Sequence, residues 1–153
     1  MKESLDNARQ ELKRVDHSIY VSLKYTRTVD MFKRILERLI SACECGMDAL
    51  LQYAKHKKKL KDLPTFSGMK YDQIIKLFSD DPKLLEYIEF YSMLKKINRA
   101  SYTSAMEFRR HVTMSLVLEG KKMDIQIEQM HEYYEKAKEF IGYVEQLIEG
   151  KPI

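Results

Sequence analysis

The sequence predicts an all-α protein, an antiparallel bundle of four to five helices with a small β-hairpin between the last two long helices. Apolar residues recur at steps of three and four along four long stretches, as on a helix face that packs against a core. The three prolines fall at or outside the ends of these stretches. The period changes to two only at about 109–127, which predicts the hairpin. A chain of 153 residues forms one domain, 1–153, by this interpretation.

Composition limits the class of protein and its compartment. The chain is 44% apolar and 33% charged, and its net charge of +4 permits a nucleic-acid partner without requiring one. Cys43 and Cys45 stand two apart and point to different sides of a helix, so they cannot form a disulfide with each other. No apolar run approaches 18 residues, and the start is not signal-like. We therefore expect a cytoplasmic protein with no membrane partner.

The first two helices are predicted from caps and apolar stripes. Ser4 is the expected cap of a first helix, which should fray into a connection near Tyr20 because the residues there become β-branched and aromatic. Thr28 is the expected cap of a long central helix that runs to about Lys61. The apolar stripe of this helix is wide enough to predict packing against more than one neighbour.

The middle of the chain contains clear helix boundaries. Pro64 and Gly68 predict a loop, and a short helix should follow from about 70 to 78. Asp81 is the expected cap of a helix over 82–99, with Pro82 in its first turn. This helix is apolar on two faces, so we expect a second subunit to cover one of them and the protein to be a homodimer.

The end of the chain is predicted as a hairpin followed by a helix. Val112, Met114 and Leu116 alternate with polar residues, and a turn at 119–122 leads into the returning strand. The final helix covers 127–149, and the residues that should end it are Gly150 and Pro152.

Basic residues give the candidate nucleic-acid site. The densest run ends the central helix and is either a solvated helix end or a phosphate-binding patch, continuous with cations near Arg99. The candidate nucleic-acid-binding residues are Lys55, Lys57, Lys58, Lys59, Lys61, Arg99, Arg109 and Arg110.

A short cationic segment is the candidate catalytic site. On an extended strand, Arg109 and His111 would share a face, and an arginine beside a histidine could hold a phosphodiester and move a proton. Arg109, Arg110 and His111 are therefore the alternative catalytic residues of a metal-independent ribonuclease. The other interpretation is a hairpin with a hydrated cationic face.

No cofactor or metal is predicted. A di-metal helical protein needs paired Glu-x-x-His elements on two helices. This chain has a single such element, Glu128 with His131. The five glycines form no phosphate-binding loop pattern.

The order of these elements resembles a known family. The central helix, a proline-containing loop, a short helix, a helix that runs into Asn98-Arg99-Ala100-Ser101-Tyr102, and a final helix reading YYEKAKEFIGYVEQLI are similar to the HEPN superfamily. The resemblance covers roughly residues 28–148 and implies a dimeric helical scaffold. Ribonucleases of that family use an arginine followed after four to six residues by a histidine. Here Ile97 falls at the arginine position, and the first histidine after Arg99 is His111, so the usual catalytic pair is missing.

Three functions follow from these observations. The leading hypothesis is a non-catalytic HEPN-like protein that acts by binding RNA or a protein partner. One alternative is the ribonuclease described above. The other is a helical partner subunit of a nucleotidyltransferase-type two-protein system.

Overall fold

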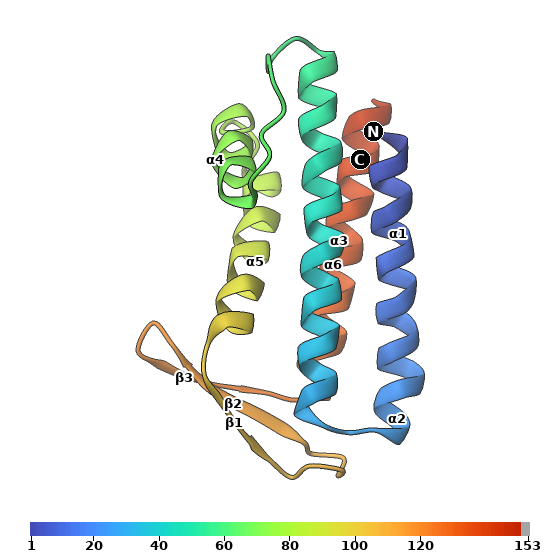
Figure 1. The fold of residues 1–153 in the computed structure, drawn as a ribbon, viewed down its shortest axis with the longest axis vertical. Helices are drawn as coiled ribbons and strands as arrows, with labels where there is room; N and C mark the ends of the chain where they lie inside the picture. The colour runs from blue at the N-terminus through green and yellow to red at the C-terminus, as the bar shows by residue number, and fades with distance from the viewer. Residues whose placement is uncertain (151–153) are drawn as a thin grey trace.

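The computed structural model describes residues 1–150 and is mostly helical, with a small antiparallel sheet (Figure 1). The mainly helical class predicted from the sequence is confirmed, whereas the expected stop at Pro152 lies outside the described residues. The elements are α1 (Lys2–His17), a π-helical turn η1 (Ser18–Ser22), α2 (Leu23–Tyr25), α3 (Val29–His56), α4 (Ser67–Leu77), α5 (Pro82–Arg99), β1 (Tyr102–Ala105), β2 (Thr113–Leu118), β3 (Lys121–Ile125) and α6 (Ile127–Glu149).

Helix α3 lies at the centre of the arrangement. It contacts α1, α4, α5 and α6, while the sheet occupies one end of the long axis (Figure 1). The wide apolar stripe of α3 is buried along its whole length, as predicted. Gly46 lets α6 approach closely, because a Cβ atom at this position would come within 2.7 Å of Ile141 Cδ1 and 3.1 Å of the Phe140 ring.

The first helical segment differs from the prediction at both ends. Helix α1 already begins at Lys2, so Ser4 does not cap it, and the Ser4 hydroxyl instead donates to Gln52 Oε1 at 3.5 Å. The helix does not fray near Tyr20 but continues through the π-helical turn to the end of α2. Burial of Ile19 and Leu23 in the core outweighs the weak local helix propensity. The predicted cap at Thr28 is confirmed, because its Oγ1 accepts from the Met31 N–H at 3.2 Å.

Helix α3 ends at His56, so the prediction of a helix to about Lys61 was wrong. Lys58 has a φ of 61° and adopts the left-handed conformation. Its N–H donates to the Lys55 carbonyl at 3.0 Å, and the Lys59 N–H donates to the Ala54 carbonyl at 2.9 Å. This pair of bonds is the Schellman motif that ends helices, usually with glycine at the left-handed position. Because a lysine occupies that position, the sequence lacked the usual stop signal.

Helices α4 and α5 follow the prediction more closely. Helix α4 begins three residues earlier than expected, at Ser67, and α5 has the predicted bounds. The Asp81 carboxylate caps α5 by accepting from the Leu84 N–H at 3.1 Å. On the second apolar face of α5, Tyr87 and Phe90 are buried against rings of α6. Part of the face expected to meet a second subunit is therefore covered within the chain.

The predicted hairpin over 109–127 is only part of the sheet. Strands β2 and β3 form it, and a strand that was not predicted, β1, pairs antiparallel with β2 (Tyr102 opposite Leu116). The segment that carries Arg109 and His111 forms turns instead of a strand, so these two side chains do not share a strand face with Thr113. Along β2, side chains that are buried alternate with side chains that are not. This alternation begins only at Val112, so the residues before it have no buried side chain that would hold them in a strand.

We predict that Lys58→Gly stabilises the protein. Left-handed backbone costs a residue with a Cβ about 1–2 kcal/mol, and the greater freedom of glycine in the unfolded chain offsets part of that gain. The free energy of unfolding, measured by urea denaturation, should rise by about 0.5–1 kcal/mol. Lys59→Gly is the matched control and should bring no gain, because Lys59 has no positive φ. An unchanged or lower stability for Lys58→Gly would contradict the role given to this position.

Candidate functional site

A basic pocket lies where the sheet meets the start of α6 and the link between α2 and α3. Its volume is about 530 Å³. We call it the basic pocket, and its lining residues are Arg27, Arg110, His111, Gln126, Ile127, Glu128 and His131. The larger hollow of about 620 Å³ over the sheet has Lys122 as its one charged lining residue, so it offers less chemistry.

Hydrogen bonds fix the turn that carries His111 against the start of α6. The Gln126 side-chain amide donates to Thr113 Oγ1 at 2.9 Å, and that hydroxyl donates to the His111 carbonyl at 2.8 Å. The main chain of Gln126 is itself held, because its N–H donates to Gln129 Oε1 at 2.8 Å. Two walls of the basic pocket, one from the sheet and one from α6, are therefore joined directly.

The loop between β1 and β2 joins the third wall. The Phe108 N–H donates to the Arg27 carbonyl at 2.7 Å, and Glu107 Oε1 accepts from the Val29 N–H at 3.4 Å. Met106 and Phe108 have φ values of 58° and 63°. Such backbone is unfavourable for bulky side chains, and residues held in it cluster at active sites and ligand-binding segments. The loop is thus held in a strained form beside Arg27.

The basic side chains of the basic pocket form no ion pairs within the described residues. Within residues 1–150, no salt bridge involves Arg27, Arg110, His111 or His131. The Nε atom of Arg27 is buried and has no hydrogen-bond partner. Buried polar atoms are nearly always paired in folded proteins, so this exception marks Arg27 as a candidate functional residue. Glu128 is the one acidic residue in the lining. The basic pocket is therefore suited to an anionic group.

Exposed aromatic side chains adjoin the basic pocket. Tyr20 is 53% exposed, and its ring packs edge-on against His131 with the ring centroids 5.0 Å apart. Phe108, whose main chain contacts Arg27, is 73% exposed, and Tyr25 is 78% exposed. Rings that are this accessible beside unpaired cations can stack on the bases of a single-stranded nucleic acid.

The residues predicted to bind nucleic acid do not form one site. Arg110 and His111 line the basic pocket, while Arg109 is exposed beside them but is not part of the lining. The lysines from Lys55 to Lys61 lie at the opposite end of α3 (Figure 1), which is 28 residues and therefore about 40 Å long. Arg99 lies in a separate hollow of about 370 Å³ between α4 and α5.

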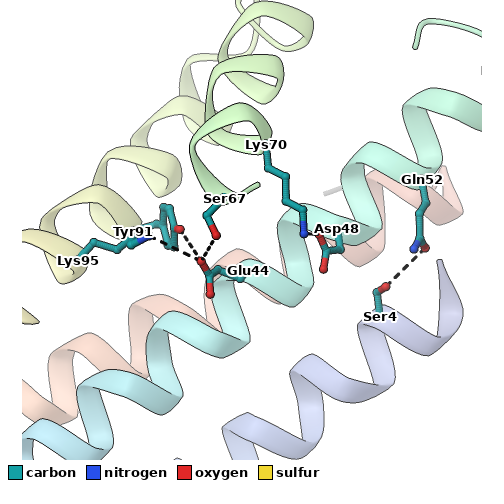
Figure 2. Close-up of polar contacts among 8 residues, drawn as sticks. All are labelled: Ser4, Glu44, Asp48, Gln52, Ser67, Lys70, Tyr91 and Lys95. Atoms are coloured by element: carbon teal, nitrogen blue, oxygen red, sulfur yellow. Dashed lines mark hydrogen bonds and ion pairs between the residues drawn. The ribbon is translucent and has the colours of Figure 1, made fainter. Parts of the chain in front are cut away.

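The hollow that contains Arg99 is less cationic than its lysines suggest, because carboxylates pair with them. Glu44 Oε2 lies 3.9 Å from Lys95 Nζ and accepts from the Tyr91 hydroxyl at 2.8 Å and from Ser67 Oγ at 3.1 Å (Figure 2). Burial and the hydrogen bond to Glu44 raise the pKa of Tyr91 above its ordinary range. The second lysine, Lys96, pairs with Glu119 at 2.8 Å. These contacts tie α4 and α5 to α3 and the sheet, which is a structural role.

Sequence reasoning did not assign the two other basic members of the basic pocket, Arg27 and His131, to a site. Arg27 stood in a predicted connection with no motif around it, and His131 was considered only as a partial metal motif with Glu128. The described residues contain no group of three or more His, Cys, Asp and Glu side chains that could hold a metal ion. No local signal could have joined Arg27 to His111 and His131, because contacts between segments about 80–100 residues apart depend on the fold.

Comparisons of this chain with protein-family models, with curated proteins and with solved structures find no match. None of the described helices is both long and apolar enough to span a membrane.

Proposed function

We propose that this chain is a HEPN-like antiparallel helical bundle that acts without catalysis, by binding single-stranded RNA at the basic pocket. The observation that carries the proposal is the grouping of Arg27 and Arg110, neither paired with a carboxylate, with exposed aromatic rings at the same place. Arginine forks bind phosphate oxygens, and aromatic rings stack on bases that are not paired. The order of the helices supports the HEPN-like scaffold, as does the helix end at Ala100 before Tyr102.

A protein partner stays the main competing ligand. Exposed Tyr25 and Phe108 suit a protein interface as well as a base, and a helical partner of a nucleotidyltransferase would present such a surface. The unpaired arginines favour RNA over this partner, because arginine forks bind phosphate oxygens and RNA presents a phosphate at every nucleotide. A pull-down that recovers a nucleotidyltransferase, together with no RNA binding, would reverse the order of the two hypotheses.

We predict that the double variant Arg27→Gln and Arg110→Gln loses RNA affinity. Each charge-assisted hydrogen bond contributes about 1.5–3 kcal/mol, so affinity for a single-stranded RNA should fall at least about tenfold. Filter binding across salt concentrations should also show a shallower salt dependence, by about one unit of the log-log slope per lost phosphate contact. The matched control is Lys2→Gln with Lys13→Gln, which removes two exposed charges from α1 and should change affinity little.

Two results would contradict the RNA proposal. The first is an absence of binding by the unmodified chain at low salt, where phosphate contacts are strongest. The second is an equal loss of affinity in the pocket variant and in the α1 control, which would show that only net charge matters.

A ribonuclease is the second candidate function, favoured by the presence of His111 and His131 in one pocket. One imidazole could take the proton of an RNA 2′-hydroxyl as that oxygen attacks the neighbouring phosphorus. The other could give a proton to the departing 5′-oxygen, which leaves a 2′,3′-cyclic phosphate and a 5′-hydroxyl end. Arg110 would hold the phosphate during this step.

The ribonuclease function predicts cleavage of mixed RNA in the presence of a chelator. Replacing either histidine, by His111→Ala or His131→Ala, should slow cleavage by a factor of about 10²–10⁴, which is the usual contribution of a general acid or base. The matched control His56→Ala removes an exposed histidine at the far end of α3 and should leave the rate unchanged. Cleavage that survives both pocket variants would come from a contaminating enzyme, and we would then abandon this function.

The homodimer also stays a prediction, and a second subunit would cover the part of the second apolar face of α5 that α6 leaves open, where Leu85 and Met93 are only partly buried. Light scattering at micromolar concentration should report twice the 18.2 kDa mass of one chain. A value near 18.2 kDa would remove the dimer from the proposal.

A further inference from the structure

The first residues of α6 bring free main-chain donors to the basic pocket. Ile127 and Glu128 open this helix, and both line the pocket. The N–H groups in the first turn of a helix have no partner within the helix itself. Among residues 1–150, no hydrogen bond uses the N–H of Ile127 or of Glu128, and the next main-chain bond is the one from the Met130 N–H to the Gln126 carbonyl at 3.3 Å. Two N–H groups are therefore available to a ligand.

The positive charges of the basic pocket exceed its negative charge. Arg27 and Arg110 carry two permanent charges that no ion pair within the described residues neutralises. The start of α6, a helix of 23 residues, adds the positive end of its dipole, equivalent to about half a charge. Glu128 is the one carboxylate in the lining. The excess is therefore roughly one and a half positive charges before either histidine is protonated.

This excess suits one kind of phosphate better than another. A phosphate inside an RNA chain carries one negative charge and has two oxygens that are not bonded to carbon. A phosphate at the end of a chain carries about 1.5–2 negative charges at neutral pH and has three such oxygens. A protein carboxylate has one charge and two oxygens. The terminal phosphate is therefore the best match in charge, and its third oxygen can accept from further donors.

We propose that the basic pocket binds the phosphate at the end of a single-stranded RNA. The forks of Arg27 and Arg110 bind two of its oxygens, and the free N–H groups of Ile127 and Glu128 donate to the third. This inference rests on the proposed RNA function and narrows its ligand to a chain end with a phosphomonoester. Such a group occurs at a 5′ end or at a 3′ end, and both offer the same chemistry to the pocket.

The exposed rings beside the basic pocket also suit a chain end. Tyr20 packs against His131, a lining residue, and the Phe108 N–H donates to the Arg27 carbonyl. A nucleotide inside a single strand has neighbours on both sides, whereas the last nucleotide has a neighbour on one side only. One face of its base is consequently free to stack on an aromatic ring, and base stacking of this kind stabilises complexes of single strands.

Fluorescence anisotropy with the full chain tests the proposal. The probes are three forms of one internally labelled oligouridine, with a 5′-phosphate, with a 3′-phosphate and with hydroxyl groups at both ends. At least one phosphorylated form should bind about tenfold more tightly than the hydroxyl form, which is the effect of one hydrogen bond to a charged group. The form with the higher affinity identifies the end that the pocket binds.

A proline at the first position of α6 tests the main-chain donors. Ile127→Pro removes one free N–H at a helix position that favours proline, and the preceding Gln126 already has the extended backbone (φ −121°, ψ −179°) that a following proline requires. The preference for the phosphorylated end should fall about tenfold. The matched control Ile127→Val trims the same partly buried side chain but keeps the N–H, so the preference should remain.

Removing the carboxylate of the pocket should have the opposite effect. Glu128→Gln raises the excess of positive charge, so affinity for the phosphorylated RNA should increase by roughly fivefold. Glu3→Gln makes the same change of net charge at an exposed position of α1 and should leave affinity nearly unchanged. Equal gains in the two variants would show that net charge, and not the pocket, determines binding.

The outcomes separate this inference from the RNA function on which it rests. If all three RNA forms bind equally, RNA binding stands and recognition of a terminal phosphate is wrong. If none of them binds, both proposals fail. An equal loss of preference in Ile127→Pro and Ile127→Val would assign the effect to the side chain and remove the N–H groups from the site. Far-ultraviolet circular dichroism of every variant separates loss of binding from loss of fold.

Discussion

The burial of α3 on several sides is the constraint on which the rest of the structure depends. A helix that contacts α1, α4, α5 and α6 must bury a wide apolar stripe, and polar residues in its middle such as Glu44 bond to the helices that cover it. Gly46 sets how closely α6 approaches, while hydrogen bonds at Thr28 and Lys58 set where the helix starts and stops. The basic pocket lies at the end of this helix that Thr28 caps, and the lysines from Lys55 to Lys61 lie at the other end.

The basic pocket exists because three distant segments meet at the first of these ends. Its polar framework consists of the bond from the Phe108 N–H to the Arg27 carbonyl and of bonds made by side chains such as Thr113 and Gln126, whose hydroxyl and amide lead to the His111 carbonyl. None of these bonds uses the side chain of Arg110 or His111. The basic pocket is therefore a site whose geometry is fixed without using the groups that would contact a ligand.

The sequence predicted elements well where a cap or an alternating pattern marks them, and poorly where tertiary contacts decide. Helices α5 and α6 have their predicted bounds because Asp81, Pro82 and Gly150 are unambiguous signals. Strand β1 was missed because its residues, YTSA, are all exposed and show no alternation, so only pairing with β2 makes it a strand. At the site, Arg110 and His111 were predicted from their neighbouring positions. Arg27 could not be, since the fold alone brings it to them.

The π-helical turn at Ser18–Ser22 has a consequence for how this helix tolerates change in length. Along an α-helix, residues four apart drift by about 40° per step, so a run such as Val15, Ile19 and Leu23 would gradually rotate away from the core. The wider turn takes up this drift, and all three are buried. A π-helical turn is what one inserted residue leaves in a helix. Deleting one residue beside Tyr20 would therefore convert this turn to an ordinary α-helical one and reposition the aromatic ring, while the core on either side of the turn keeps its packing.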